Sequence, residues 1–266
     1  MGPLRFTWGN PASRLELIFV PGTQGRPYSF GEESVRPAIE VPDFFLATVV
    51  VTNDLWAHVM QEPFDSGIAP PPPRQPRLEV SWDHLTAPVD GFLARLNAGG
   101  SGSSLLSTIR DQAPAPYRTN GRFRLPSETE WEYAARGGPH WRDGYRFSGG
   151  NDIELVAWYQ LNSGDRNHDV ALKEPNQLGL YDMCGNVWEW CQDAFTPDLA
   201  QIPTDGSPFA GGGAAAAAAA IANAEDERVL RGGCHHNWAI HCTVAKRYAI
   251  GRAFHDGCIG FRLAFS

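Results

Sequence analysis

Glycine and proline interrupt this chain so often that long regular elements are excluded over most of its length. The 266 residues include 28 glycines and 21 prolines, which favour turns and weaken the interiors of helices and strands. After Gly138, only short strand-like runs separated by turns remain. Because 42% of the residues are hydrophobic, nine tryptophans among them, the chain can still bury a proper core. No sharp change of composition divides it, so we expect one α+β domain over residues 1–266, with few regular elements and many loops.

Four segments of the N-terminal half carry the patterns of strands and helices. Residues 15–20 form an apolar run closed by Pro-Gly, and residues 39–51 form a longer β-branched and aromatic run, so both predict strands. Thr52 and Asn53 then predict the start of a short helix with an apolar face. A second helix is expected after Thr86, with a proline in its first turn.

The clearest helix signal is a capping box that begins at Ser127. The hydroxyl of Ser127 can accept a hydrogen bond from the amide of Glu130, while the carboxylate of Glu130 accepts one from the amide of Ser127. We expect this helix to end at Gly137 and Gly138, in left-handed backbone.

Residues 211–220 consist of three glycines followed by seven alanines. Alanine favours helix but offers little surface to bury. We therefore expect residues 197–226 to form an insertion on the surface of the domain.

The charge of the chain excludes some classes of partner. A formal net charge of −8 and a sequence pI of about 5.5 argue against general binding to nucleic acid or to anionic membranes, which need an excess of lysine and arginine. No apolar run reaches the roughly 20 residues that a membrane span needs, and no secretory signal is visible at the N-terminus. We expect no membrane insertion. The cellular location of the protein stays open. The cytoplasm is the default, and the alternative is that another route delivers the protein to a surface.

All five cysteines lie in the C-terminal third of the chain. An odd number of thiols without a signal peptide does not indicate a disulfide framework, although Cys191 and Cys242 could pair. Cysteine and histidine residues are also concentrated after Gly233. These residue types can bind zinc or iron, but their spacing matches no standard ligand motif. The residues of that metal hypothesis are Cys234, His235, His236, His241 and Cys242.

Three long motifs carry a resemblance to a known family. They read RLPSETEWEYAARGG at 124–138, NQLGLYDMCGNVWEW at 176–190, and RVLRGG at 228–233 with its closure IGFRL at 259–263. Together with residues 19–23 and 51–53, they resemble the formylglycine-generating enzyme (sulfatase-modifying factor) superfamily over nearly the whole chain. The resemblance implies a variant of the C-type lectin fold.

The same resemblance offers a test of catalysis. Formylglycine-generating oxidases bind Cu(I) with two cysteines that follow the Arg-Gly-Gly segment, as a soft metal prefers. Laid onto this chain, the second cysteine is Cys242, but the first position holds Asn237, whose amide cannot replace a thiolate. The related sulfoxide synthases use an additional N-terminal helical domain for which this chain has no room. A metal-dependent oxidoreductase acting on a protein cysteine therefore stays as the alternative, with a structural or regulatory family member as a third interpretation.

Residues 234–258, here called the C-terminal window, resemble the variable region of the variable proteins of diversity-generating retroelements. In those proteins, mutagenesis directed at adenines of asparagine codons diversifies a C-terminal stretch of the lectin-like domain. The resemblance implies a ligand-binding surface without catalytic residues, whose partner is an unknown protein or other macromolecule. The expected surface residues are Cys234, His235, His236, Asn237, Trp238, Ile240, His241, Thr243, Val244, Tyr248, Ile250, Ala253, Phe254, His255, Gly257 and Cys258.

No cofactor is required by this interpretation, and calcium is the one ion that the resemblance suggests. Some family members bind calcium at the positions of Asp182, Gly185, Val187 and Glu189, where carboxylates and carbonyls would supply oxygen ligands. The alternative is that Asp182 and Glu189 are hydrogen-bonded carboxylates of the core. Arg231 and Arg262 are expected to brace the strands around the C-terminal window through carboxylate pairs.

Overall fold

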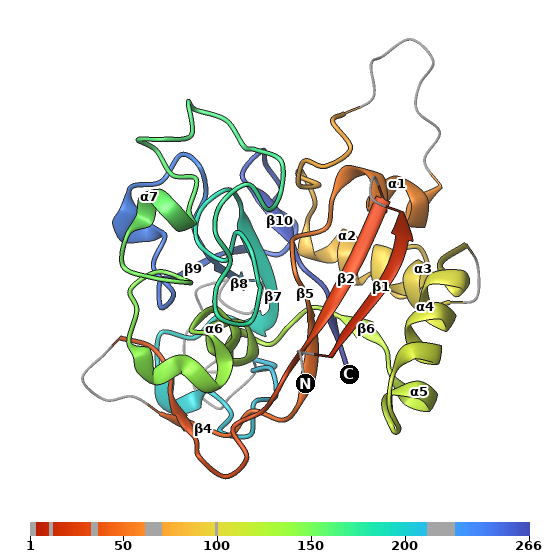
Figure 1. The fold of residues 1–266 in the computed structure, drawn as a ribbon, viewed down its shortest axis with the longest axis horizontal. Helices are drawn as coiled ribbons and strands as arrows, with labels where there is room; N and C mark the ends of the chain where they lie inside the picture. The colour runs from red at the N-terminus through yellow and green to blue at the C-terminus, as the bar shows by residue number, and fades with distance from the viewer. Residues whose placement is uncertain (1–3, 11–12, 33–36, 62–70, 99–100, 212–226) are drawn as a thin grey trace, which may run out of the picture.

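The computed structural model describes residues 4–10, 13–32, 37–61, 71–98, 101–211 and 227–266 (Figure 1). Two sheets organise these residues, and helices and long turns cover them. No described helix is long and apolar enough to cross a membrane.

The first sheet unites the two ends of the chain. Its five strands run in the order β1-β2-β5-β11-β6, and all neighbours are antiparallel. Because the C-terminal strand pairs between β5 and β6, the last residues of the chain lie inside the sheet rather than at its edge. The strands are β1 (Arg5–Asn10), β2 (Ser13–Val20), β5 (Phe44–Ala47), β6 (Phe123–Arg124) and β11 (Ala264–Phe265).

The second sheet carries the motifs of the C-terminal half. Its order is β10-β7-β8-β9, with β10 parallel to β7 and the other pairs antiparallel. Figure 1 shows it beside the first sheet. Its strands are β7 (Trp188–Ala194), β8 (Glu227–Arg231), β9 (Arg247–Gly251) and β10 (Ile259–Phe261), and a separate hairpin joins β3 (Tyr28–Ser29) to β4 (Ala38–Ile39).

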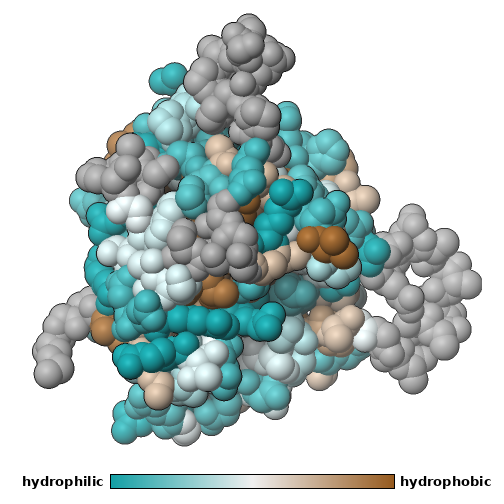
Figure 2. Space-filling model, turned by 90° about the vertical axis from the view of Figure 1, so that its right-hand side faces the viewer, coloured by the Kyte–Doolittle hydropathy of each residue, from teal (hydrophilic) through white to brown (hydrophobic). Residues whose placement is uncertain are grey.

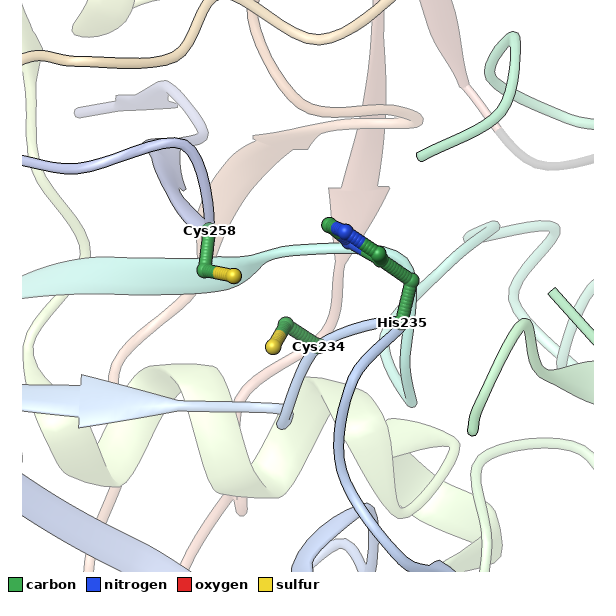
Figure 3. A group of neighbouring side chains, drawn as sticks. All are labelled: Cys234, His235 and Cys258. Atoms are coloured by element: carbon green, nitrogen blue, oxygen red, sulfur yellow. The ribbon is translucent and has the colours of Figure 1, made fainter. Parts of the chain in front are cut away.

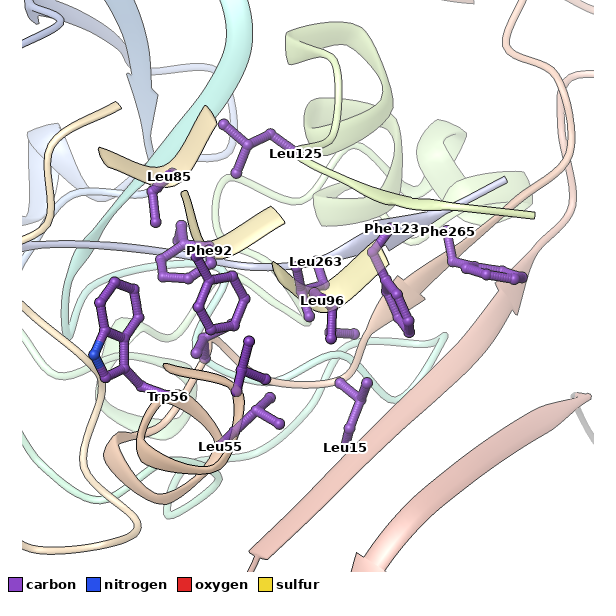
Figure 4. Packing of buried hydrophobic residues seen from close by; sticks show 14 of the residues in the cluster. Leu15, Leu55, Trp56, Leu85, Phe92, Leu96, Phe123, Leu125, Leu263 and Phe265 are labelled. Atoms are coloured by element: carbon purple, nitrogen blue, oxygen red, sulfur yellow. The ribbon is translucent and has the colours of Figure 1, made fainter. Parts of the chain in front are cut away.

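Five helices pack beside the first sheet and enclose one of the apolar clusters (Figure 4). The rings of Trp56 and Phe92 stack there, with centroids 5.0 Å apart. Figure 2 shows the outer face of this side as mostly hydrophilic, so the apolar residues of the helices turn inward. The helices are α1 (Asn53–Met60), α2 (Trp82–Thr86), α3 (Phe92–Asn97), α4 (Ser101–Gln112) and α5 (Tyr117–Asn120).

The region after Thr86 differs from the prediction of one helix that starts there. Helix α2 ends at Thr86, and α3 begins only at Phe92. Ala87 has ψ of 131°, because the ring of a following proline disfavours helical backbone in the residue before it. Pro88 therefore separates two short helices.

Helix α6 (Glu128–Ala135) confirms the predicted capping box. Ser127 Oγ accepts from the amide of Glu130 at 3.2 Å, and the carboxylate of Glu130 accepts from the amide of Ser127 at 2.8 Å. Gly137 and Gly138 follow with φ of 87° and 59°, as predicted. Every residue of α6 is buried, so its glutamates form internal contacts instead of a solvated face.

In the described part of residues 197–226, most of residues 197–211 are exposed, as a surface insertion would be, but the segment is anchored to the core at three buried positions. Leu199 and Ile202 are buried in the second apolar cluster, and the carbonyl of Gly206 accepts from Ser127 Oγ at 2.8 Å. Residues 197–211 therefore lie on the surface of the domain and are held to it by these contacts. Residues 212–226, with the alanine run, lie outside the described residues.

The remaining short helices of the described residues all follow α6 in the chain. They are η1 (Gly138–Asp143), α7 (Ile153–Val156), η2 (Leu199–Gln201) and η4 (Ala239–His241).

Candidate functional site

The C-terminal window lies between β8 and β10 of the second sheet. Within it, the chain forms the short helix η4 and then β9, which pairs only with β8 among the described strands. Its strand β9 therefore forms one edge of that sheet, while the end of the window leads into β10 at the opposite edge.

Exposed aromatic residues are concentrated in the window. Trp238, Tyr248 and Phe254 have 54%, 49% and 43% of their surface exposed, and Ile240 has 60%. In the part of the chain that the structure describes, these three are the aromatic residues classed as exposed. Large apolar groups normally avoid water, so their concentration in one segment indicates a surface for contact.

The sixteen predicted surface residues divide into three groups. Four of them, Cys234, His235, Thr243 and Val244, are buried, which corrects the prediction for these positions. Val244 packs in the second apolar cluster and Cys234 in the first. Eight are exposed: His236, Trp238, Ile240, Tyr248, Ala253, Phe254, His255 and Gly257; Asn237, His241, Ile250 and Cys258 are half-buried.

Buried charge holds the window from beneath. The guanidinium of Arg231 donates to the carbonyls of Ala245 and Val244 at 2.8 and 3.0 Å, and it pairs with Glu132 of α6. Arg247, on β9, makes two hydrogen bonds of 2.7 Å to Glu128. Arg231 therefore braces the window through carboxylate pairs, as predicted.

The first turn of the window rests on a neighbouring loop. Asn237 Oδ1 accepts from the amide of Cys234 at 2.9 Å, and the carbonyl of Asn237 accepts from the amide of Gln160 at 3.0 Å. The hydroxyl of Ser163 donates to the carbonyl of His235 at 3.0 Å. These bonds fix the backbone, while the side chain of Trp238 extends outward.

The arrangement does not provide a copper pair. Asn237 stands at the position of the first thiolate, and its side chain is used in the turn. Cys242 is fully buried, and burial raises the pKa of its thiol. Cu(I) prefers soft thiolate ligands, so a single buried thiol and an amide do not fit it.

The zinc or iron set predicted after Gly233 is also rearranged. Cys234 and His235 come together with Cys258 instead, and one donor atom of each lies within 4.8 Å of the others (Figure 3). His236 binds Asp165 through Nδ1 at 2.6 Å. The spacing of residues gave no sign of Cys258 as a partner, because the strand order alone brings the end of the window back to its start.

The two thiols of this cluster shift each other's pKa in opposite directions. The hydrogen bond from Cys258 lowers the pKa of Cys234, and the same bond raises the pKa of Cys258. Burial lowers the pKa of His235.

The calcium set fits poorly, because Glu189 is already paired. Its two oxygens accept from Arg262 at 2.7 Å each, and Oε2 also accepts from Trp131 Nε1 at 2.8 Å. Asp182 Oδ2 accepts from the amide of Ala171, while its buried Oδ1 has no partner. Burial raises the pKa of Asp182 to about 6. Glu189 is thus a hydrogen-bonded core carboxylate, as the alternative interpretation predicted, and both of its oxygens are already used inside the protein. Calcium binding at the four residues stays a prediction.

The pairing of Cys191 with Cys242, which the sequence left open, is not present in the structure: both thiols are free and buried.

Residues 10–266 match the family described as the sulfatase-modifying factor enzyme 1-like domain. A formylglycine-generating enzyme of Streptomyces coelicolor is 36% identical over 159 residues, which are 53% of this chain and 46% of that protein. The mouse formylglycine-generating enzyme is 29% identical over 84% of this chain and 57% of its own length. The chain thus spans about half the length of these curated relatives.

The structural comparisons cover the whole domain. Treponema denticola variable protein 1 matches with a TM-score of 0.73 and 26% identity, over 98% of this chain and 99% of its own. PvdO from Pseudomonas aeruginosa matches with a TM-score of 0.69 and 20% identity, over 100% and 99% of the two chains. These matches confirm the predicted fold and the likeness to a variable protein.

Proposed function

This chain belongs to the family of sulfatase-modifying factor enzyme 1-like domains. We propose that, within this family, it is a ligand-binding variable protein of a diversity-generating retroelement and not an oxidase. Its binding surface is the exposed part of the C-terminal window. The observation that carries the proposal is the set of exposed aromatic and aliphatic side chains at Trp238, Ile240, Tyr248 and Phe254.

The physical argument is that a firm frame carries side chains suited to recognition. Aromatic residues contribute much of the binding energy at protein interfaces, and adaptable polar residues such as histidine surround them. Here Arg231 and Arg247 hold the backbone of the window through buried carboxylates. Exchange of exposed side chains leaves that frame unchanged, because substitutions at exposed positions usually change stability by about 0.5 kcal/mol or less.

The division of the window supports the same proposal. The buried residues Thr243 and Val244 belong to the frame, together with Cys242 and Ala245. The exposed residues lie before and after them. This pattern of a fixed middle and variable flanks suits a surface that is diversified without loss of the fold. The match to a variable protein over 98% of the chain adds support.

The chemistry of the exposed residues favours a macromolecular partner. A set of separated aromatic and aliphatic side chains suits a broad protein surface better than a small molecule, which binds in a concave pocket. The net charge of −8 disfavours nucleic acid. A protein, or another macromolecule with an apolar surface, is therefore the proposed partner.

The DNA beside the gene tests the retroelement directly. We expect a near-copy of the segment that encodes residues 234–258, differing from it at adenines, next to a reverse transcriptase gene. Codons of the exposed residues should differ between the two copies, while those of Thr243 and Val244 should differ less often. A neighbourhood without such a copy would contradict the proposal.

The oxidase alternative has its own test. Copper-loaded protein is incubated with a sulfatase-derived cysteine peptide in air, and loss of the peptide thiol is followed. We expect no oxygen-dependent loss. Turnover that disappears in the Cys242→Ala variant would favour the oxidase function over the ligand-binding function.

A further inference from the structure

The two ends of the C-terminal window meet at a cluster that the proposed ligand surface does not use. Cys234 lies near the start of the window, and Cys258 directly precedes β10. With His235 they present two sulfur atoms and one imidazole nitrogen, all within 4.8 Å of one another (Figure 3). We propose that Cys234, His235 and Cys258 form a zinc site with three protein ligands.

The donor set has the right chemistry for this ion. Zinc is held in proteins by cysteine sulfur and histidine nitrogen, commonly in tetrahedral geometry, whereas calcium and magnesium prefer oxygen. With Zn–S and Zn–N bonds of about 2.3 and 2.0 Å, ligand atoms of one tetrahedron lie roughly 3.5–3.8 Å apart. The donors lie within 4.8 Å already, so small side-chain rotations bring them to these distances.

The orientation of His235 is fixed by a carbonyl. His235 Nδ1 lies 2.9 Å from the carbonyl oxygen of Asn186, and a carbonyl oxygen can only accept, so Nδ1 carries the hydrogen. The other nitrogen, Nε2, then keeps its lone pair for a metal. A hydrogen bond of this kind on the far side of the ring is the usual support of a metal-binding histidine.

Both cysteines lie on ordered backbone. The amide of Cys258 donates to Asp256 Oδ1 at 2.8 Å, and its carbonyl accepts from the amide of Trp188 at 2.8 Å. The amide of Cys234 donates to Asn237 Oδ1 at 2.9 Å. The three donors are therefore held together before any ion arrives, which reduces the ordering that binding requires.

Three protein ligands leave a fourth position for water. Cys234 and His235 are buried, while Cys258 is half-buried, so the fourth position is expected on the side of Cys258. The neighbouring His236 is paired with Asp165 at 2.6 Å and is not counted among the ligands. Bound zinc would tie the start of the window to its end.

Binding is a simple exchange of protons for the ion. Each thiol loses its proton to the buffer as its sulfur binds the metal, and no electron is transferred. A disulfide between Cys234 and Cys258 is the competing fate of the same sulfurs. It would need an external oxidant and would remove two of the three ligands.

The test uses the full chain, reduced, freed of metal and titrated with Zn²⁺ against a chromogenic chelator. We expect one zinc ion per chain. With Co²⁺ as the probe, we expect a thiolate-to-cobalt charge-transfer band and the intense visible bands of tetrahedral cobalt. Cys258→Ser and His235→Ala should each weaken zinc binding by at least about tenfold, a loss already seen when only an outer-shell partner is removed.

Cys242→Ala is the matched control, because Cys242 is a buried thiol of the same segment outside the cluster. It should keep one zinc per chain and the cobalt spectrum. Circular dichroism shows whether each variant is folded, and the half-buried Cys258→Ser variant is expected to remain so. Unchanged zinc affinity in folded Cys258→Ser, a cobalt complex without the charge-transfer band, or a Cys234–Cys258 disulfide with no zinc uptake after reduction would overturn the proposal.

Discussion

Arg262 and Glu189 form a doubly hydrogen-bonded ion pair inside the protein, with both N–O distances at 2.7 Å. Both side chains are fully buried. Arg262 also donates to the carbonyls of Ala47 and Tyr181, at 2.9 Å each. One guanidinium thus links the first sheet to the motif that ends in β7, and it uses both oxygens of Glu189 inside the core.

Glu189→Gln should therefore destabilise the protein strongly. The substitution leaves the charge of Arg262 buried without a counter-charge, which typically costs about 3–5 kcal/mol. The midpoint of urea unfolding measures the change. Glu16→Gln is the control, because Glu16 pairs with the partly exposed Arg5 and Arg14 and should cost less than about 1 kcal/mol. Equal losses in the two variants would contradict the role of the buried pair.

Asp193 should make stability depend on pH. Burial and the nearby carboxylate of Glu128 raise the pKa of Asp193 from 3.8 to about 8. The folded protein then keeps a proton that the unfolded chain releases, so stability falls as pH rises from about 4 to 8 and levels off above that. For one group the slope is at most about 1.4 kcal/mol per pH unit.

Asp193→Asn isolates this contribution. The variant loses a carboxylate oxygen that accepts from a backbone amide, so it should be less stable, but its stability should lack this slope. The difference in unfolding free energy between wild type and variant should therefore shrink from pH 5 to pH 8. A difference that stays constant would show that the two amide donors keep Asp193 ionised throughout.

The sequence predicted those helices and turns that are determined by residues close together in the chain. The capping box of Ser127 and Glu130 lies within four residues, so α6 follows directly from the chain. The break at Pro88 is local too, and the rule for residues before proline could have predicted it. The burial of every residue of α6 could not be predicted, because Glu128 and Glu132 are matched by Arg231 and Arg247, which come from distant strands.

The candidate site shows the same limit. The resemblance placed a contact surface in the C-terminal window, but it could not separate exposed from buried positions. Val244 is buried in the second apolar cluster, and its carbonyl accepts a hydrogen bond from Arg231, which comes from a distant strand. The approach of Cys258 to Cys234 depends on the parallel pairing of β10 with β7, which no spacing in the chain indicates.

Stability should separate the surface of the window from its frame. Trp238→Ala removes an exposed ring and should change the unfolding free energy by about 0.5 kcal/mol or less. Val244→Ala removes buried methyl groups and should cost about 2 kcal/mol. Urea unfolding of both variants measures the contrast. If Trp238→Ala were as destabilising as Val244→Ala, the ring would belong to the core and not to a binding surface.

Gly185 should be the least replaceable glycine of the motif at 176–190. Its φ is 74°, and an added Cβ would lie 2.2 Å from the carbonyl oxygen of Trp158, a backbone atom that cannot move aside easily. Gly185→Ala should therefore cost about 1–2 kcal/mol from left-handed backbone alone, and more from the clash. Gly150→Ala is the matched control, because a Cβ there meets no atom within 4 Å and its φ is not in the left-handed region. Thermal unfolding of the two variants gives the comparison. If the Gly185→Ala protein were as stable as the Gly150→Ala protein, the turn at Gly185 could relax away from Trp158. The contact between the loop that contains Trp158 and the start of the C-terminal window would then not be rigid.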